Sequence, residues 1–194
     1  GVSYLYGETD GEIWVHDFAM ESRRGADIDL ATVREPFHAC FARVFAGQVA
    51  DDGFNNLVLG AGLEWREILI LRAYCKFLLQ SRIQFSQAYM EETLANKPAL
   101  AGAIVALFFA RFDPEVAGTT AGTRRAKKLW GQITTGFDLV ANLDEDRILR
   151  RFFNAIESTL RTNFFMTEDD GALKSYASFK IDSQNVDELP EPRP

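Results

Sequence analysis

A chain of 194 residues, of which 47% are hydrophobic and 25% charged, is long enough to bury a core, and this composition excludes wholesale disorder. The formal net charge of −7 argues against a general nucleic-acid binder, so we expect no nucleic-acid partner. No signal peptide or long apolar span is visible, so we expect no membrane partner and a cytoplasmic location.

Residues 1–22 are predicted to form a β-hairpin. Residues 2–6 and 13–20 are rich in β-branched and aromatic side chains, and Asp10-Gly11 between them is a strong turn signal. Because two strands alone are marginally stable, we expect the hairpin to complete a sheet whose other strands lie elsewhere. The chain starts without Met and closes on Leu-Pro-Glu-Pro-Arg-Pro, which is typical of a linker, so we expect it to be a piece of a longer protein.

Residues 28–166 are predicted to form an α-helical domain around one central helix, residues 63–80. Leu71 and Cys75 belong to an apolar stripe along that helix, and Tyr74 belongs to a second apolar group on the opposite side. A helix that is apolar on nearly all sides lies inside the fold rather than on its surface. We therefore expect the other helices to pack around this one.

Residues typical of helix ends place six further helices around the central one. The expected N-caps, in chain order, are Asp29 or Thr32, Asp51 or Asp52, Ser86, Thr120 or Thr123, and Asp144, with Pro98 at a first helical position. The expected ends are Gly47, Gly60 with Gly62, Asn96, the residue before Asp113, and Asn142. Pro36 is expected only in the opening turn of its helix, because an interior proline removes a hydrogen bond.

The segment after residue 140 is predicted to contain the last of these helices and then a strand. A buried helix face is predicted from apolar residues that recur every four positions, namely Ile148, Phe152, Ile156 and Leu160. Residues 172–182 include the alternating segment YASFKI and predict a strand, and residues 183–194 form a proline-rich linker. The chain is therefore predicted to be mainly α, a multi-helix bundle around a central apolar helix with an N-terminal β-hairpin and one short C-terminal strand.

No constellation in the sequence predicts a catalytic, cofactor-binding or metal site. The nearest match to a dinucleotide fingerprint is Gly-Ala-Gly at residues 60–62, but Trp65 stands where the third glycine belongs, and a helix precedes the match instead of a strand. The two histidines, His16 and His38, do not cluster with other metal ligands. We therefore expect no catalytic residue, no metal ligand and no cofactor bound by this chain.

The cysteines and two of the tryptophans are predicted to be structural. Cys40 and Cys75 both lie in apolar helical sequence, which favours buried free thiols over a disulfide. Trp65 and Trp130 also lie in predicted helices, where a place in the core is a simpler interpretation than a ligand platform.

Basic residues of two helices are candidates for contact with another domain. The candidates are Arg124, Arg125, Arg147, Arg150 and Arg151. The first two adjoin two lysines and could bind phosphate or nucleic acid, although a solvated helix face is the simpler interpretation in an acidic chain. The other three follow an acidic helix cap and could instead form within-helix ion pairs worth about 0.2–0.5 kcal/mol each.

Several blocks of sequence are more specific together than any single motif. They are FNNLVLGAGLEWREILILRAYCKFLLQ at residues 54–80, FSQAYMEETL at 85–94, ANLDEDRILRRF at 141–152, LRTNFF at 160–165, and SFKID followed by LPEPRP. These blocks closely resemble the large bacterial NAD-dependent glutamate dehydrogenases, in which ACT-like domains, a helical region and a catalytic domain follow one another. The resemblance implies that residues 1–22 are the tail of an ACT-like domain and that residues 183–194 lead towards the catalytic domain.

The same resemblance implies that the parent protein converts L-glutamate, NAD and water to 2-oxoglutarate, ammonia and NADH. The family's substrate segment and nucleotide-binding fold would lie beyond Pro194, so NAD would serve the parent and not this chain. We therefore expect a non-catalytic scaffolding or regulatory segment whose partners are the catalytic and ACT-like domains of the same chain, within a homo-oligomer. The alternative is an independent α-helical protein-interaction module with no enzymatic role.

Overall fold

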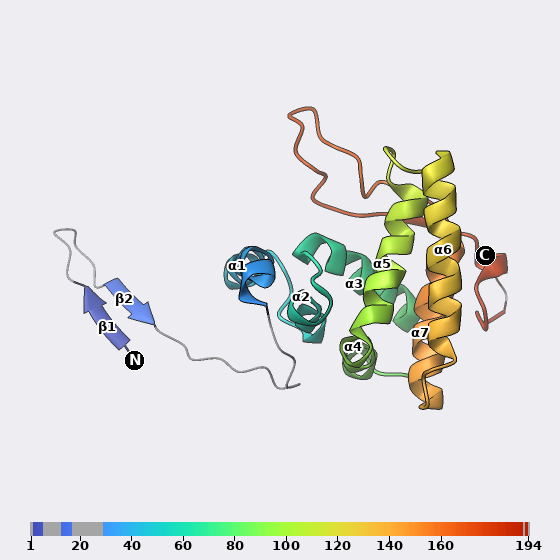
Figure 1. Cartoon of the computed structure of the whole chain (residues 1–194), viewed down its shortest axis with the longest axis horizontal. Coiled ribbons are helices and arrows are strands. Elements are labelled where there is room, and N and C mark those ends of the chain that lie inside the picture. The colour runs from blue at the N-terminus through green and yellow to red at the C-terminus, as the bar shows by residue number, and fades with distance from the viewer. Residues whose placement is uncertain (1, 6–12, 17–28, 192, 194) are drawn as a thin grey trace.

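The computed structural model describes residues 2–5, 13–16, 29–191 and 193, and helices dominate this part of the chain (Figure 1). The α-helices are α1 (Leu30–Phe45), α2 (Asn56–Ala61), α3 (Trp65–Gln80), α4 (Gln87–Asn96), α5 (Pro98–Phe112), α6 (Thr120–Phe137) and α7 (Leu143–Glu157). The strands are β1 (Val2–Leu5), β2 (Ile13–His16), β3 (Thr159–Thr162) and β4 (Phe179–Ile181), and the short 3-10 helices are η1 (Gly53–Asn55) and η2 (Ser183–Asn185). The predicted mainly α architecture is confirmed.

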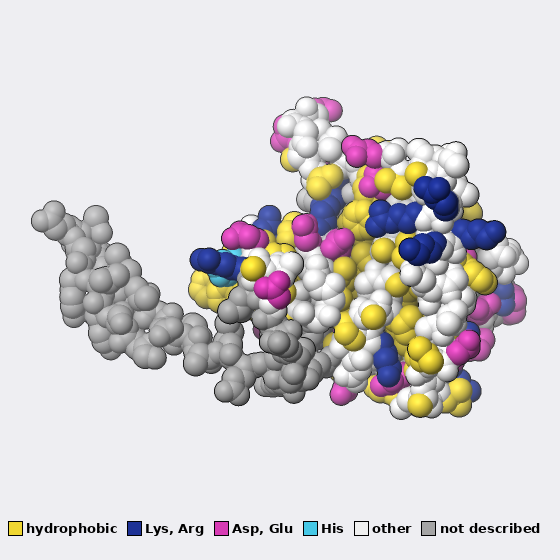
Figure 2. Space-filling view, in the orientation of Figure 1, with side chains coloured by type: hydrophobic (Ala, Val, Ile, Leu, Met, Phe, Trp, Pro, Cys, Tyr) yellow, Lys and Arg dark blue, Asp and Glu magenta, His cyan; other side chains and the backbone are white. Residues whose placement is uncertain are grey.

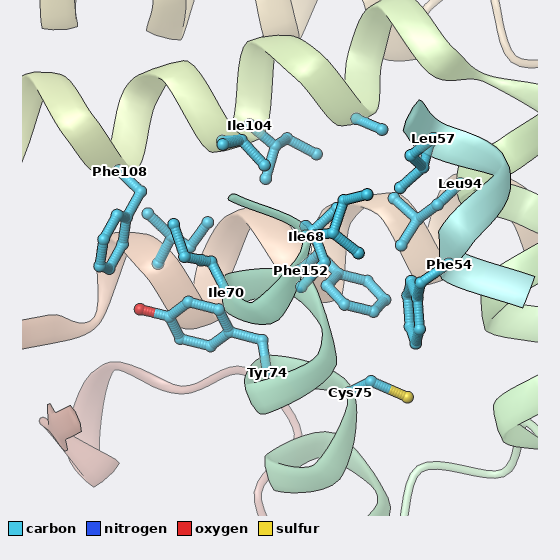
Figure 3. Close-up of a cluster of buried hydrophobic side chains, with 14 of the residues drawn as sticks. Phe54, Leu57, Ile68, Ile70, Tyr74, Cys75, Leu94, Ile104, Phe108 and Phe152 are labelled. Carbon is cyan, nitrogen blue, oxygen red and sulfur yellow. The ribbon is translucent and has the colours of Figure 1, made fainter. Parts of the chain in front are cut away.

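Helix α3 is the centre of the helical body. It contacts α1, α2, α4, α5 and α7, while α5, α6 and α7 pack side by side along one flank (Figure 1). Because neighbours surround α3, Ile68, Ile70, Leu71 and Tyr74 are at most 1% exposed. Figure 3 shows Ile68, Ile70 and Tyr74 among side chains from η1, α2, α4, α5 and α7. The prediction of a central, apolar helix is therefore confirmed.

Helix α5 supplies much of the facing core surface. Its buried side chains include Ile104 and Phe108, and its one charged residue is Arg111, in its last turn. Among the described residues no single helix is long and apolar enough to cross a bilayer. Only α4 and α5 taken together, across a bend of 99°, reach the required length and composition.

Many helix boundaries follow the predicted caps. Asp29, Asp52 and Ser86 each accept a hydrogen bond from a backbone N–H in the turn that follows. Pro98 occupies the opening turn of α5, where its missing N–H would have no partner within the helix. Gly62 ends α2 with a φ of 65°, a left-handed conformation that glycine adopts without a steric penalty.

Four boundary predictions were wrong, and one of them is Asp144, which was expected to cap the last long helix but is the second residue of α7. Pro36 lies in the interior of α1, as its seventh residue, where it removes one backbone hydrogen bond. Thr119 caps α6, one residue before the earlier predicted cap. Asn142, which was expected to end α6, instead caps α7 by accepting hydrogen bonds from two N–H groups of its first turn, while α6 ends at Phe137.

The buried face predicted for the last helix extended one position too far. Helix α7 ends at Glu157 and the chain enters β3, which pairs antiparallel with β4. The pairing shifts between Thr159 and Arg161, so Leu160 is an extra residue in a β-bulge and its side chain is 56% exposed. The predicted C-terminal strand is present as β4, but its partner β3 lies in residues that were predicted to be helical.

The N-terminal strands form a two-stranded antiparallel sheet. Val2 lies opposite His16, and the pairing continues to Leu5 opposite Ile13. This matches the predicted pairing of two strands, while the predicted Asp10-Gly11 turn lies outside the described residues.

Candidate functional site

The buried titratable groups of the core are held in their neutral forms. Burial raises the pKa of the Cys75 thiol to about 12, and it raises the pKa of Cys40 and of the Tyr74 phenol above their ordinary values. Both cysteines are free and buried, as predicted, so neither carries a thiolate that could act as a nucleophile near neutral pH. Among the described residues, no three His, Cys, Asp or Glu side chains are grouped to hold a metal ion.

The Gly-Ala-Gly segment at residues 60–62 does not fit the pyrophosphate of a dinucleotide. A dinucleotide fingerprint needs a glycine turn between a strand and a helix, so that helix N–H groups reach the phosphates. Here the segment ends α2 and leads into α3. Trp65, in the third glycine's place, is half-buried with the Arg43 guanidinium 4.4 Å from its ring centroid.

The polar contacts with the clearest structural consequence join the helical core to residues 158–190, which we call the C-terminal segment. Arg111 of α5 holds the point where this segment begins. Its Nη1 donates to the Ile156 carbonyl at 3.1 Å and to Glu157 Oε1 at 2.6 Å, and its Nη2 donates to the Glu157 carbonyl at 3.0 Å. These carbonyls end α7, where intrahelical partners run out and the helix dipole favours a cation. Arg111 is thus a C-terminal cap supplied by another helix.

A buried hydrogen bond links α3 to the first residue of β3. The Tyr74 hydroxyl lies 2.7 Å from Thr159 Oγ1, and both residues are only 1% exposed. The Thr159 hydroxyl is itself 2.8 Å from the Ala155 carbonyl, to which it donates, so Tyr74 is the donor to Thr159. Burial raises the pKa of the Tyr74 phenol, so the hydroxyl keeps its proton and remains a donor near neutral pH.

Aromatic rings also join the helical core to the C-terminal segment, and we call this whole contact region the junction. Phe108 of α5 lies within 6.0 Å, between ring centroids, of Phe164, Phe165 and Phe179 of the C-terminal segment. Arg66 of α3 donates from Nη2 to the Phe164 carbonyl at 2.8 Å and lies over the ring of the same residue. A cluster of aromatic rings therefore joins α3 and α5 to the C-terminal segment.

The far end of the C-terminal segment is held by the outer side of α7. Arg151 bonds to the Asp187 carbonyl and the Glu188 carboxylate. Asn154 exchanges hydrogen bonds with residues 185 and 187 at 3.1 and 2.9 Å. Arg151, Arg147 and Arg82 also line a pocket of about 310 Å³ with both acidic residues. The carboxylates balance much of the positive charge there.

The five predicted contact arginines are divided among three environments. Arg147 pairs with Asp144 at 3.8 Å and Arg150 with Asp146 at 2.8 Å, both within α7, as the ion-pair alternative predicted. Arg151 instead binds the C-terminal segment. The last two, Arg124 and Arg125, are exposed on α6 with no ion pair among the described residues, in the basic group that Figure 2 shows over one end of this helix. Their role in contacts with another domain stays a prediction.

Sequence reasoning missed Arg111, Tyr74 and Thr159 as junction residues. Arg111 did carry a signal, because it is the single charge in a strongly apolar helix and a buried charge needs a partner. Tyr74 and Thr159 carried none, since each fits the periodicity of an ordinary helix face, and their contact joins residues 85 positions apart.

Comparison with protein families divides the chain between α5 and the second half of α6, so the C-terminal segment and α7 belong to the second match. Residues 49–114 match the model described as glutamate dehydrogenase, helical motif 3, and residues 132–194 match the catalytic domain of bacterial NAD-glutamate dehydrogenase. The second match begins inside α6, well before the predicted linker at residues 183–194. The predicted domain boundaries stay predictions.

Curated relatives match nearly the whole chain. It is 38% identical over 191 residues to the NAD-specific glutamate dehydrogenase of Halomonas elongata, covering 98% of this chain, and 39% identical over 184 residues to that of Pseudomonas aeruginosa, covering 94%. The enzyme of Mycobacterium tuberculosis is 35% identical over 188 residues, again 94% of the chain. The chain spans only about 12% of the length of these relatives. With both family models and these relatives in agreement, the chain belongs to the bacterial NAD-specific glutamate dehydrogenase family.

Proposed function

We propose that this chain is a non-catalytic scaffold within an NAD-dependent glutamate dehydrogenase, joining the helical region of the parent protein to its catalytic domain. The parent would oxidise L-glutamate with NAD and water to 2-oxoglutarate, ammonia and NADH. The supporting observation is that the polypeptide matching helical motif 3 and the polypeptide matching the catalytic domain share one core. Phe108 belongs to the first of these and packs on Phe164 and Phe179 of the second.

A shared core of this kind favours a rigid connection over a flexible one. Domains that meet only through a small polar interface move relative to one another, whereas a large apolar interface holds them together. Here the Tyr74–Thr159 pair adds a buried hydrogen bond and Arg111 adds part-buried ones, and their rupture would leave polar groups without partners. We infer that the junction fixes where the catalytic polypeptide leaves the helical region.

In this proposal hydride transfer takes place in another part of the parent, where NAD binds. The partners of this chain are then the ACT-like and catalytic domains of the same polypeptide, in a cytoplasmic homo-oligomer. The junction residues suit a structural role, because the Tyr74 phenol is buried and already committed to Thr159, and Arg111 is committed to the end of α7.

The test is a pair of assays for NADH formation from L-glutamate and NAD. The full-length enzyme is expected to be active and the 194-residue chain inactive. In the full-length enzyme, Arg111→Met is expected to lower the melting temperature while kcat stays within about twofold, because the substitution loosens packing and removes no reacting group. Arg161→Met, at an exposed position of β3 that is not among the candidates for contact with another domain, is the matched control. A loss of kcat by about 100-fold or more in a fully folded Arg111→Met enzyme would contradict the scaffold proposal.

The alternative function is an independent protein-interaction module, and one observation favours it. Phe41 and Phe45 of α1 are 57% and 87% exposed, and exposed apolar groups of this size are typical of contact surfaces. Sedimentation of the isolated chain separates the two functions. Self-association that Phe45→Ser abolishes would support the module, and a monomer at all concentrations would support the scaffold.

A further inference from the structure

A second pocket, of about 200 Å³, lies where three parts of the chain meet. Its lining comes from the end of α1 and the turn after it, from the start of α3, and from the loop between β3 and β4 (residues 163–178). The residues that line it and carry the argument are Arg43, Trp65, Arg66, Lys174 and Tyr176. Arg66 also contacts Phe164 at the junction, but the other residues that line this pocket are not among the junction contacts described above, and the proposed scaffold function does not use the pocket.

The lining of this pocket carries three cations and no carboxylate. Arg43, Arg66 and Lys174 come from three different parts of the chain. The pocket beside Arg82 differs, since Asp187 and Glu188 there offset the arginines. Three converging cations without a lining acid produce a positive potential that attracts an anion.

Two of the cations have no acidic partner among the described residues. Arg43 donates one hydrogen bond to the Ala39 carbonyl at 3.3 Å, and Arg66 donates one to the Phe164 carbonyl at 2.8 Å. A guanidinium carries five N–H donors, so most of theirs remain available. Arg66 is half-buried, and burial lowers its pKa, which means that its charge is incompletely solvated. An anion in the pocket would offset that cost.

Aromatic rings form the apolar part of the same lining. Arg43 lies over Trp65, and Lys174 lies 5.9 Å from the centroid of the Tyr176 ring, which is 60% exposed. Lys174 also pairs with Glu168 at 2.9 Å, and Glu168 is not among the residues that line the pocket. A pocket lined by cations and by aromatic rings can bind a ligand that has both a negatively charged group and a flat apolar body.

We propose that this pocket binds a small organic anion, consisting of an aromatic ring that bears a carboxylate or a phosphate. The two arginines hold the anionic group through charge-assisted hydrogen bonds, and Tyr176 packs on the ring. Lys174 adds charge from the β3–β4 loop, so binding also fixes that loop against α3. The pocket accepts a ligand of about the size of benzoate and is too small for a whole dinucleotide.

The test is ligand-observed NMR and calorimetry on the 194-residue chain with four probes. Benzoate and phenyl phosphate carry a ring and a charge, benzamide keeps the ring without the charge, and acetate keeps the charge without the ring. We expect the better of the two ring anions to bind with a Kd of about 1 mM, and benzamide and acetate to bind at least about tenfold more weakly. Whichever ring anion binds more tightly identifies the preferred anionic group.

Variants locate the bound anion. Lys174→Met and Tyr176→Ala change exposed or half-buried side chains of a loop, so the fold is retained, and each is expected to weaken binding by about three- to tenfold. Lys180→Met on β4 is the matched control, because Lys180 is exposed and does not line the pocket. The proposal is overturned if neither ring anion binds at about 20 mM, if benzamide binds equally well, or if both loop variants bind as the unmodified chain does.

Discussion

Two rows of phenylalanines in this molecule have different environments. Phe37, Phe41 and Phe45 follow one another along α1, with neighbouring rings stacked at centroid distances of 6.1 and 6.2 Å, and the last of them is 87% exposed. Phe108 of α5 is fully buried and meets Phe164 edge to face, at an interplanar angle of 86°. The rings of the first row are brought together by the repeat of a single helix. Phe108 and Phe164 are brought together only when chain segments more than fifty residues apart pack on each other.

The difference shows which apolar residues stabilise this fold. A ring that touches only its own helix leaves most of its surface in water, so its contribution to the free energy of unfolding is small. A ring enclosed by other elements contributes through burial and also through ring geometry, worth about 0.5–1.5 kcal/mol for each aromatic pair. The junction of core and C-terminal segment should therefore dominate stability, and the exposed rings of the α1 row, Phe41 and Phe45, should matter little, whereas Phe37 packs against the core.

The largest expected effect is that of Phe108→Ala. Removing a fully buried ring that contacts rings of three other segments leaves a cavity, and we expect the free energy of unfolding to fall by about 3–5 kcal/mol. Urea denaturation monitored by circular dichroism measures this change. Phe41→Ala is the matched control for the same substitution at a half-exposed ring. Equal losses in the two variants would contradict the comparison.

A smaller effect is expected when only the polar link within the buried cluster is removed. Tyr74→Phe keeps the ring but deletes the hydroxyl that donates to Thr159, and we expect a loss of about 1–2 kcal/mol. The double variant with Thr159→Val measures the coupling between the two residues, which should be positive because they form one hydrogen bond. Additive losses would show that the pair does not hold the junction.

The buried residues Cys75 and Tyr74 should also make the free energy of unfolding depend on pH in the alkaline range. The phenylalanines of the α1 row have no group that titrates. Burial raises the pKa of Cys75 from its ordinary value of 9.0 to about 12. Between these values the unfolded chain has released this proton and the folded chain retains it, so stability is complete below pH 9 and falls as the pH rises. Chemical denaturation from pH 8 to 11 should show a shallower decline for Cys75→Ala, with the remaining slope due to Tyr74 and Cys40. An unchanged slope would contradict this origin.

Helices, caps and helix ends that depend on neighbouring residues could be predicted from the sequence. Helix α3, the caps at Asp29, Asp52 and Ser86, and the glycine end of α2 all follow from patterns within a few residues. Their physical causes are equally local, since a cap satisfies an N–H two or three positions away. The resemblance to glutamate dehydrogenases likewise rested on continuous blocks and agrees with the relatives found.

The features that sequence reasoning missed depend on contacts between distant residues. Leu160 continued an apolar repeat but lies in a strand, because Thr159 binds Tyr74 of another helix. Trp130 was expected in the core and is 47% exposed, since α6 covers α5 with its other side. Arg82, in the turn after α3, has a left-handed backbone with a φ of 60°, at a position where the sequence has no glycine. Periodicity shows that a face is apolar, but it does not show which element will cover it.

The smallest expected effect is that of Phe45→Ser, and it tests the other half of the comparison. In the 194-residue chain the change in the free energy of unfolding should stay within about 0.5 kcal/mol, because an 87% exposed ring loses little burial. In the full-length enzyme the same substitution should lower the melting temperature if another domain covers α1, since the ring would then be buried. A loss of several kcal/mol in the short chain would mean that the α1 row is already covered there, and the contrast with Phe108 would no longer hold.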